Sequence, residues 1–373
     1  MHENKAFPSG SPPEYTAVTT NAPAAARSKW NPLGWPLWGK LLGVALVIGI
    51  IVGIIVGAVV GTKKHAYPNY SRLVYSIEDR YEGEEFFDNF DYFHDYDPAQ
   101  GFVHYVPQAT ANSSQYNLTY ATSTSAVLKV DTTDQNANTG RYSVRIVSKK
   151  QYHTGLFVFD VIHSPYGCST WPALWLADPT YWPENGEIDV VEAVEQGNTG
   201  AQSTLHTKKG CTMDVKREQY GGVLANNCWN GTDDNAGCGV QGAPETYGEA
   251  LNKNGGGIFA MELRDAGIRV WFFNRTNTPG DIASGNDSSP DPTTWGMPLA
   301  DFPSTDCDIS SHFRNQSIIA NIDLCGSWAG STGVYSEQYG CPGTCEEYVT
   351  SNATAFSEAY WEWADFRVYS AAS

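Results

Sequence analysis

The stretch Gly186-Glu-Ile-Asp-Val-Val-Glu192 mixes acidic and β-branched residues, and its local conformation decides how the chain around it is interpreted. On an α-helix, Glu187 and Asp189 would point about 200° apart, so their carboxylates could not converge. The β-branched residues favour a strand, on which Glu187 and Asp189 share one face. Glu192 would fall on the other face unless a single β-bulge between Asp189 and Glu192 restores the register. We therefore predict a bulged strand that presents three carboxylates together.

Short apolar and aromatic runs, separated by Gly, Pro, Asn and Asp, continue on both sides of this stretch. Their length and spacing are typical of the strands of an all-β sandwich. Examples are Ser143–Val147, Gly155–Val161, Ile258–Leu263 and Ile268–Phe273. We predict an all-β jelly roll of two antiparallel sheets, formed by one domain over residues 76–373.

A run of 21 apolar residues, Leu41–Gly61, precedes this domain. A helix of that length crosses the hydrocarbon core of a bilayer, which is about 30 Å thick. Trp35 and Trp38 lie just before it, where interface anchors often lie. Because a long segment comes first, we predict a signal anchor rather than a cleaved signal. Residues 1–40 are expected to be a disordered cytosolic tail, 41–61 the transmembrane anchor and 62–75 a stalk.

Glycines recur every fourth residue in the apolar run. On a helix they form one smooth ridge, which permits close contact with a second helix. Glycine is also common in transmembrane helices without such contact, so self-association of the helix stays one of two readings. The ridge consists of Gly49, Gly53, Gly57 and Gly61.

The cysteines and the N-glycosylation sequons indicate an extracellular or lumenal domain, and therefore a single-pass type II topology. All eight cysteines and all eight sequons follow the apolar run. An even number of cysteines without a C-x-x-C pair favours disulfides over zinc. Among the pairings, the short spacing suggests Cys341–Cys345. The sequons are Asn69, Asn112, Asn117, Asn230, Asn274, Asn286, Asn315 and Asn352.

The charge balance restricts the partners. The formal net charge is -18, and such an acidic chain repels the phosphates of a nucleic acid. A neutral polysaccharide is compatible with it. The same charge also keeps a secreted protein soluble without any specific function.

The three carboxylates fit the chemistry of glycoside cleavage. Retaining glycosidases use two carboxyl groups about 5–5.5 Å apart, one attacking the anomeric carbon and one protonating the leaving oxygen. The two groups must differ in pKa, and a third carboxyl between them helps to set that difference. An ordinary acidic strand on a solvated face is the alternative interpretation of this motif alone.

Further blocks of sequence decide between these interpretations, because together they resemble glycoside hydrolase family 16, in particular fungal laminarinase-like endo-1,3(4)-β-glucanases. The resemblance extends over about residues 76–371. The blocks are Phe86–Asp91, Gly101–Val106, Ser143–Lys149, Gly155–Asp160, Cys168–Trp175, Gly186–Glu192, Thr204–Thr207, Asn235–Val240, Ile268–Phe273 and Trp295–Pro298.

The resemblance implies a jelly roll with a concave glycan cleft and a role for each site residue. Glu187 matches the family's nucleophile, Asp189 its assisting carboxylate and Glu192 its acid/base. Trp175 and Trp182 match tryptophans that line the cleft, where an indole stacks on sugar C–H surfaces. His206 resembles a histidine near the cleaved sugar. Core packing for the tryptophans and a structural role for His206 are the alternatives.

Three positions depart from the family pattern, namely Ala193, Glu195 and Leu263, so substrate preference stays open. The expected activity is retaining hydrolysis of β-1,3 or mixed β-1,3-1,4 glucan. A cell-wall transglycosylase and a non-catalytic glucan-binding module are the alternatives. The carboxylate chemistry needs no cofactor. The family often binds a structural calcium, which we assign to no residues; the oxygen-rich stretch from Asp131 to Asn138 is interpreted as a surface turn.

Overall fold

The computed structural model describes residues 34–64, 66–197, 199–283 and 289–372. Of the tail expected over residues 1–40, residues 1–33 lie outside the described residues, and so does the sequon at Asn286. The chain divides into two compact units, Met1–Thr62 and Lys63–Ser373, and each is described by itself.

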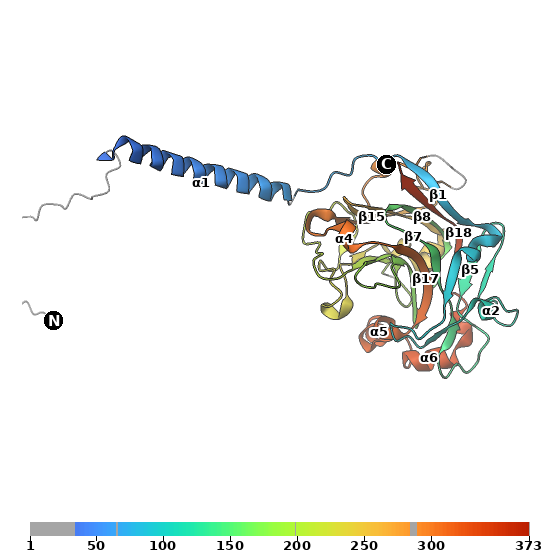
Figure 1. Ribbon diagram of the computed structural model, residues 1–373. Coiled ribbons are helices and arrows are strands. Elements are labelled where there is room, and N and C mark those ends of the chain that lie inside the picture. The colour runs from blue at the N-terminus through green and yellow to red at the C-terminus, as the bar shows by residue number, and fades with distance from the viewer. Residues whose placement is uncertain (1–33, 65, 198, 284–288, 373) are drawn as a thin grey trace, which may run out of the picture. The chain divides into compact units, whose positions relative to one another are not determined.

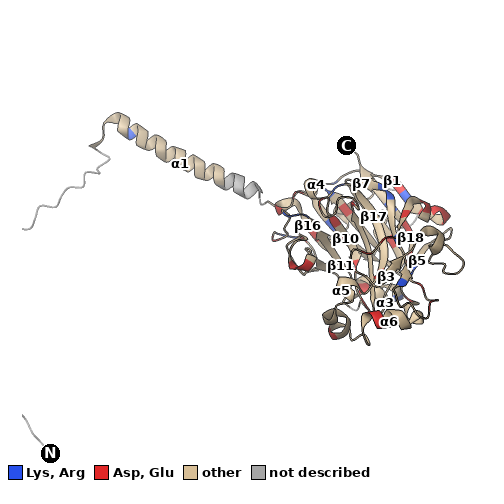
Figure 2. Ribbon diagram, turned by 60° about the horizontal axis from the view of Figure 1, so that its bottom comes forward, with Lys and Arg blue, Asp and Glu red and all other residues tan. Residues whose placement is uncertain are grey.

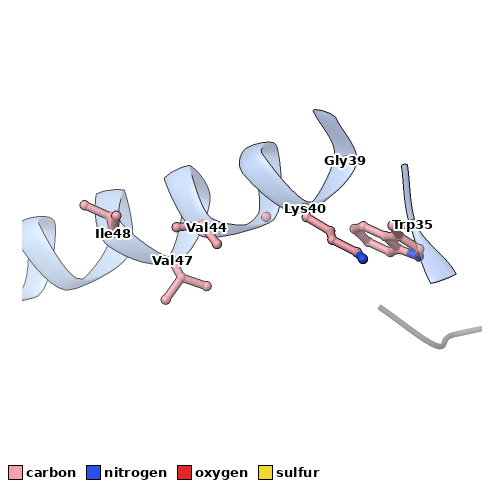
Figure 3. Close-up of a pocket in the computed structure, with 7 residues that line it drawn as sticks. Trp35, Gly39, Lys40, Val44, Val47 and Ile48 are labelled. Carbon is pink, nitrogen blue, oxygen red and sulfur yellow. The ribbon is translucent and has the colours of Figure 1, made fainter. Parts of the chain in front are cut away.

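Helix α1 (Leu37–Lys64) contains the expected apolar run (Figure 1). Its segment Leu37–Gly57 is long and apolar enough to cross a membrane. The ring of Trp35 turns back along the first turn of the helix, where a Cβ added at Gly39 would lie 3.5 Å from it. Figure 3 shows Trp35 and the amine of Lys40 together at this end, with Val44 and Val47 further along. An aromatic ring and a cation thus flank the start of the apolar segment, as at a membrane interface.

The described part of the second unit is a β-sandwich of two eight-stranded antiparallel sheets with a small parallel pair (Figure 1). The first sheet has the order β16 (Ala300–Pro303), β15 (Gly267–Asn274), β14 (Gly257–Arg264), β8 (Gly155–His163), β18 (Tyr360–Ala371), β5 (Ala126–Lys129) and β4 (Thr119–Ala121), with β1 (Tyr75–Glu82) also paired to β18. The second has the order β12 (Gly222–Val223), β13 (Val240–Gln241), β11 (Gln202–His206), β10 (Glu187–Glu192), β9 (Thr170–Ala177), β17 (Gln316–Leu324), β7 (Arg145–Tyr152) and β2 (Phe90–Phe93). The parallel pair is β3 (Val103–Tyr105) and β6 (Arg141–Ser143). The predicted all-β jelly roll is confirmed.

The helices of the described second unit are short and lie in connections. The α-helices are α2 (Gln108–Ala111), α3 (Gly248–Lys253), α4 (Ile309–His312), α5 (Gly326–Ala329) and α6 (Cys345–Ser351). The 3-10 helices are η2 (Gly83–Asn89), η3 (Asp233–Asn235), η4 (Pro244–Thr246), η5 (Pro292–Thr294), η6 (Ser304–Asp306) and η8 (Ala353–Phe356), and η7 (Gly333–Gln338) is a π-helix.

Three of the four strands expected from apolar runs are confirmed, in β8, β14 and β15. The fourth run, Ser143–Val147, is divided because Ser143 ends β6 while Arg145 begins β7. The hydroxyl of Ser143 donates a hydrogen bond to the carbonyl of Ile322 in β17 at 2.6 Å. The chain therefore changes its pairing partner at this point, from β3 to β17.

The core between the sheets is aromatic and aliphatic. Phe86 is completely buried and stacks on Phe90 and on Trp363, with ring centroids 5.3 and 5.8 Å apart. Burying one such large side chain contributes about 1.5–3 kcal/mol relative to leaving it in water. The core thus fixes the positions of the strands that carry the candidate site.

Four disulfides connect all eight cysteines, and the pairing suggested for Cys341 and Cys345 is wrong. Cys341 pairs with Cys168, and Cys345 pairs with Cys325. Cys168 precedes β9 and Cys325 follows β17, and these neighbouring strands meet at the pair Thr170 and Leu324. Cys341 and Cys345 are therefore not bonded to each other. They form disulfides with cysteines just before the start of β9 and just after the end of β17. The other pairs are Cys211–Cys307 and Cys228–Cys238.

Residues 63–75 of the expected stalk belong to the second unit, and two of their tyrosines pack against its β-sandwich. The hydroxyls of Tyr67 and Tyr70 donate to the two carboxylate oxygens of Asp301, at 2.9 and 3.1 Å. The guanidinium of Arg269 lies 4.0 Å from the centroid of the Tyr70 ring. We call Tyr67 and Tyr70 the tyrosine strap. The proposed domain boundaries themselves stay a prediction.

Candidate active site

Strand β10 brings three carboxylates together as the sequence predicts. Against β11, Glu187 pairs with His206 and Asp189 with Thr204, and the register then shifts before Glu192. A shift at the same place appears in the pairing with β9. The β-bulge predicted between Asp189 and Glu192 is therefore confirmed. The intervening apolar side chains Ile188, Val190 and Val191 are completely buried on the core side.

The start of β10 is held by close backbone packing. Gly186 has a φ of +73°, and a Cβ there would lie 2.4 Å from the carbonyl oxygen of His312. Only glycine permits this approach at a positive φ. The side-chain amide of Gln316 donates to the carbonyl of Asn185 at 2.7 Å. These contacts determine where Glu187 begins the strand.

Buried Asp189 and His206 form an ion pair on adjacent strands. The distance from Nε2 of His206 to Oδ2 of Asp189 is 3.4 Å. The other ring nitrogen, Nδ1, lies 3.0 Å from Oδ1 of Asn235. Burial lowers the pKa of His206, but the hydrogen bond that its ring donates to Asp189 and the charges of Glu187 and Glu192 outweigh this effect and raise that pKa to about 10. A positive imidazolium is thus placed among the three carboxylates.

Each glutamate accepts a hydrogen bond from one indole. Nε1 of Trp182 donates to Oε2 of Glu187 at 2.5 Å, and Nε1 of Trp171 donates to Oε1 of Glu192 at 2.8 Å. Trp182 is 43% exposed, so its ring faces solvent rather than the core. This excludes core packing for Trp182.

Trp175 lies on β9 opposite Asp189 in the strand register. Its Nε1 donates to Oδ1 of Asn321 at 2.8 Å, and the guanidinium of Arg145 lies 4.8 Å from its ring centroid. The ring is half-buried. Trp175 therefore belongs to the face of the sheet that bears the carboxylates but makes no hydrogen bond to them.

The two glutamates have raised pKa values with different balances of cause. Burial, followed by the charge of Asp189, raises the pKa of Glu187 to about 7 and that of Glu192 to about 8. His206 and an indole donor oppose this rise in both cases. The charge of Arg145 additionally lowers the pKa of Glu187, whereas the charge of Glu187 further raises the pKa of Glu192. The charge of Arg145 therefore favours the ionised form of Glu187, and the charge of Glu187 disfavours the ionised form of Glu192.

Trp171, Asn235 and Arg145 belong to the site and were missed by the sequence reasoning. Trp171 precedes Trp175 by four residues on a strand, so both share a face, and this spacing could have identified it. Asn235 and Arg145 are brought in from distant segments, and no local pattern indicates them.

The fold and this arrangement define the class of protein. A β-sandwich that places two glutamates of raised pKa and one aspartate on a single strand is the arrangement of a glycoside hydrolase. The family model described as an XgeA-like, catalytic GH16 domain matches residues 90–369. The chain belongs to glycoside hydrolase family 16.

Relatives agree with this assignment. The chain is 46% identical to a probable glycosidase of Schizosaccharomyces pombe, over 82% of this chain and 72% of that protein. It is 38% identical to an endo-1,3(4)-β-glucanase of Arthroderma benhamiae, over 79% of this chain and 65% of that protein. A probable endo-1,3(4)-β-glucanase of Aspergillus flavus is 37% identical, and the match covers 43% of its length. Relatives of this kind are thus longer than the matched region.

Two solved structures are similar over the catalytic domain. Laminarinase 16A of Phanerochaete chrysosporium, with 6-O-glucosyl-laminaritriose in both donor and acceptor sites, has a TM-score of 0.76 and 45% identity. The similarity covers 80% of this chain and 100% of that one. An elongating family 16 β-1,3-glucosyltransferase has a TM-score of 0.73 and 37% identity, over 79% of this chain and 100% of that one. The catalytic domain therefore resembles both glucan hydrolases and a glucan transferase.

Proposed function

We propose that the chain hydrolyses internal β-1,3 bonds, or mixed β-1,3-1,4 bonds, of a glucan with net retention of anomeric configuration. The observation that carries this proposal is the bulged strand β10, on which Glu187 and Glu192 each accept one indole N–H. The positive charge of the His206 imidazolium acts on both glutamates. The endo-1,3(4)-β-glucanases and the laminarinase among the similar proteins support the substrate class.

The electrostatic asymmetry supports the roles of the two glutamates. Glu187 is assigned as the nucleophile, since the charges of His206 and Arg145 favour its carboxylate. Glu192 is assigned as the acid, because burial and the charges of Asp189 and Glu187 disfavour its negative form. The ion pair of Asp189 with His206 positions negative and positive charge beside both groups.

The proposed reaction has two displacements. In the first, an oxygen of Glu187 attacks the anomeric carbon while Glu192 gives its proton to the departing glycosidic oxygen, forming a glycosyl ester and an ionised Glu192. In the second, Glu192 takes a proton from water, the water oxygen attacks the same carbon, and Glu187 leaves as carboxylate. Two inversions give retention, and the enzyme returns to its starting protonation state.

We propose no cofactor for this reaction, since the two carboxyl groups supply both the nucleophile and the proton. Glu187, Asp189 and His206 are close enough together to bind a metal ion. However, a protonated imidazole has no free lone pair for a metal, and the pKa of His206 is raised to about 10. The oxygen-rich stretch from Asp131 to Asn138, interpreted from the sequence as a surface turn, also fits a cation poorly. The carboxylate of Asp131 already accepts from the backbone of Thr133 and Asp134.

We propose that α1 anchors the enzyme in a membrane as a type II protein with the second unit outside. The apolar length of Leu37–Gly57 and the four disulfides support this. We also propose that α1 associates with the α1 helix of a second copy through the ridge formed by Gly49, Gly53 and Gly57. Figure 2 shows acidic residues on many elements of the second unit, which supports a neutral partner rather than a nucleic acid.

A transglycosylase is the second candidate function, and the similarity to an elongating β-1,3-glucosyltransferase favours it. Both activities pass through the same glycosyl ester and differ in whether water or a sugar hydroxyl accepts the glycosyl group. The site residues named above do not distinguish these acceptors.

Product analysis tests both candidates. The full chain in detergent is incubated with laminarin, with mixed-linkage β-glucan and with short β-1,3-gluco-oligosaccharides, beside Glu187→Gln and Glu192→Gln. We expect the wild type to give short reducing products whose first-formed anomer has the β configuration by NMR. Glu187→Gln should give no reducing products. Products longer than the starting oligosaccharide would identify a transglycosylase, and a first-formed α anomer would contradict the retaining mechanism.

A further inference from the structure

A second concave site lies in the part of the domain built on the parallel pair β3 and β6, and a residue of α2 also lines it. Its volume is about 410 Å³, which lies within the range of small-ligand pockets, about 300–1,000 Å³. The catalytic carboxylates are not among its lining residues. We call it the tyrosine pocket, and the side chains that matter here are His104, Tyr116, Asp134, Thr139 and Tyr142.

Two aromatic rings form one wall of this pocket. Tyr116 and Tyr142 are half-buried, with ring centroids 5.1 Å apart and ring planes tilted by 58°. His104 meets the Tyr142 ring edge-on, with ring centroids 6.2 Å apart. No described residue makes a hydrogen bond with either tyrosine hydroxyl. A half-exposed ring whose polar end has no protein partner is suited to a ligand with both C–H surface and hydroxyl groups.

The polar groups of the pocket offer donors and acceptors without a free positive charge. Nε2 of His104 lies 3.1 Å from the hydroxyl of Thr139. The exposed carboxylate of Asp134 accepts one backbone N–H, from Asn136 at 2.9 Å, and keeps further capacity to accept. The pocket can therefore exchange several hydrogen bonds with hydroxyl groups.

The charges disfavour an anion and a metal ion. The nearby guanidinium of Arg141 is buried and donates to the carbonyls of Val349 and Asp134, at 2.6 and 2.9 Å. Asp131 is occupied by its own turn and lies 3.6 Å from Arg141. What remains is a neutral, hydroxyl-rich ligand with apolar faces, which is the chemistry of a sugar ring.

The pocket also lies next to the proposed catalytic face. Tyr105 lines it, and its hydroxyl accepts from Nδ2 of Asn321 at 3.1 Å. The Oδ1 of the same Asn321 accepts from Trp175 at 2.8 Å. One asparagine thus connects a pocket residue with a tryptophan of the candidate site.

We propose that the tyrosine pocket is a second, non-catalytic site that binds a glucosyl unit of the β-glucan on which the enzyme acts. That the bound sugar belongs to a β-glucan rests on the proposed function. That the ligand is a neutral sugar rests on the residues that line the pocket. Such a site would hold a long or insoluble chain near the enzyme without taking part in bond cleavage.

The experiment separates the two sites. Retention of the full chain on insoluble β-1,3-glucan is measured in detergent for Glu187→Gln alone and combined with Tyr142→Ala, Tyr116→Ala or Tyr120→Ala. Tyr120 is a 41% exposed tyrosine on β4 and serves as the control. Because each pocket variant removes one aromatic contact with the sugar, it is expected to weaken retention by about fivefold. Cleavage of a short β-1,3-gluco-oligosaccharide by Tyr142→Ala alone should equal that by the wild type.

Each outcome decides between the claims. Weaker retention of both pocket variants, with the Tyr120→Ala control unchanged, supports the second site whether or not the chain cleaves glucan. A chain that cleaves no glucan would count against the proposed function only. Unchanged retention of both pocket variants overturns the second site and leaves the proposed function intact. Sequons at Asn112 and Asn117 flank Tyr116, so the measurement is repeated after enzymatic deglycosylation. A pocket filled by the chain's own glycan would show no effect of Tyr142→Ala in the glycosylated protein and would overturn the proposal.

Discussion

His206 Nε2 lies 3.4 Å from Asp189 Oδ2, and both side chains are buried between the two glutamates of strand β10. The negative charge of Asp189 raises the pKa values of Glu187 and Glu192, and the positive charge of His206 lowers both. The pair therefore balances two opposing effects on the same carboxyl groups. If one partner of the pair is removed, the remaining partner shifts the pKa values of both glutamates without opposition from the other.

Substitutions in this pair should shift the pH dependence of kcat/KM in opposite directions. In His206→Gln the loss of positive charge raises the pKa of Glu187 and of Glu192, so both limbs of the profile move to higher pH. In Asp189→Asn the loss of negative charge lowers both, so both limbs move to lower pH. Initial rates on a soluble β-glucan from pH 4 to pH 10 would check this. Shifts in the same direction for both variants would contradict the electrostatic account.

Glu195 should make the fold less stable as the pH rises. Its side chain is completely buried, its Oε2 accepts the N–H of Ser169 at 2.6 Å, and burial raises its pKa to about 8. The folded state therefore keeps a proton that the unfolded state has lost, and stability falls between the ordinary pKa of a glutamate and about pH 8. This loss approaches about 1.4 kcal/mol per pH unit.

Glu195→Gln keeps the acceptor for Ser169 but does not titrate. Its Tm should be close to that of the wild type at pH 4.5 and should exceed it increasingly towards pH 8. Differential scanning fluorimetry across this range is the measurement. A constant difference in Tm at all pH values would show that Glu195 does not titrate in the way described.

The tyrosine strap should stabilise the catalytic domain. Tyr70→Ala removes the ring over Arg269 and the hydroxyl that donates to Asp301. For a half-buried ring we expect a loss of about 2 kcal/mol. Tyr70→Phe should lose only the hydrogen bond, about 1 kcal/mol. Tyr96→Ala, at a tyrosine that is 76% exposed, is the control and should leave Tm unchanged. Equal Tm values for the two alanine variants would mean that the strap adds no stability.

The sequence predicts the parts of the site that depend on local geometry. The β-bulge of β10 follows from the odd spacing of Asp189 and Glu192 together with the need for three carboxylates on one face. The burial of Ile188, Val190 and Val191 follows from the same alternation. Both are properties of one strand, so no distant contact is needed to infer them.

Features that depend on tertiary contacts could not be inferred in this way. Cys168 and Cys341 are separated by 173 residues. The adjacency of β9 and β17 brings Cys168 beside Cys325, and Cys325 is bonded to Cys345, four residues after Cys341. The contact of Asn235 with His206 and the tyrosine strap likewise join segments that no spacing rule connects. The tyrosine pocket combines residues of β3 and β6 with residues of the loops beside them, and no spacing rule connects these segments.

The indole donors give the sharpest test of the assigned roles. Trp182 lowers the pKa of Glu187, and Trp171 lowers that of Glu192. If Glu187 is the nucleophile, its ionisation sets the acidic limb of kcat/KM, and the proton of Glu192 sets the alkaline limb. Trp182→Phe should therefore move the acidic limb to higher pH and narrow the profile. Trp171→Phe should move the alkaline limb to higher pH and widen it.

The two phenylalanine variants control for each other, because each keeps an aromatic ring and removes one N–H donor to one glutamate. A narrowing in Trp171→Phe and a widening in Trp182→Phe would exchange the roles of Glu187 and Glu192. Because the two glutamates interact, each substitution will also shift the other limb slightly. The assignment therefore depends on which limb moves further in each variant, and rates measured at closely spaced pH values give that comparison directly.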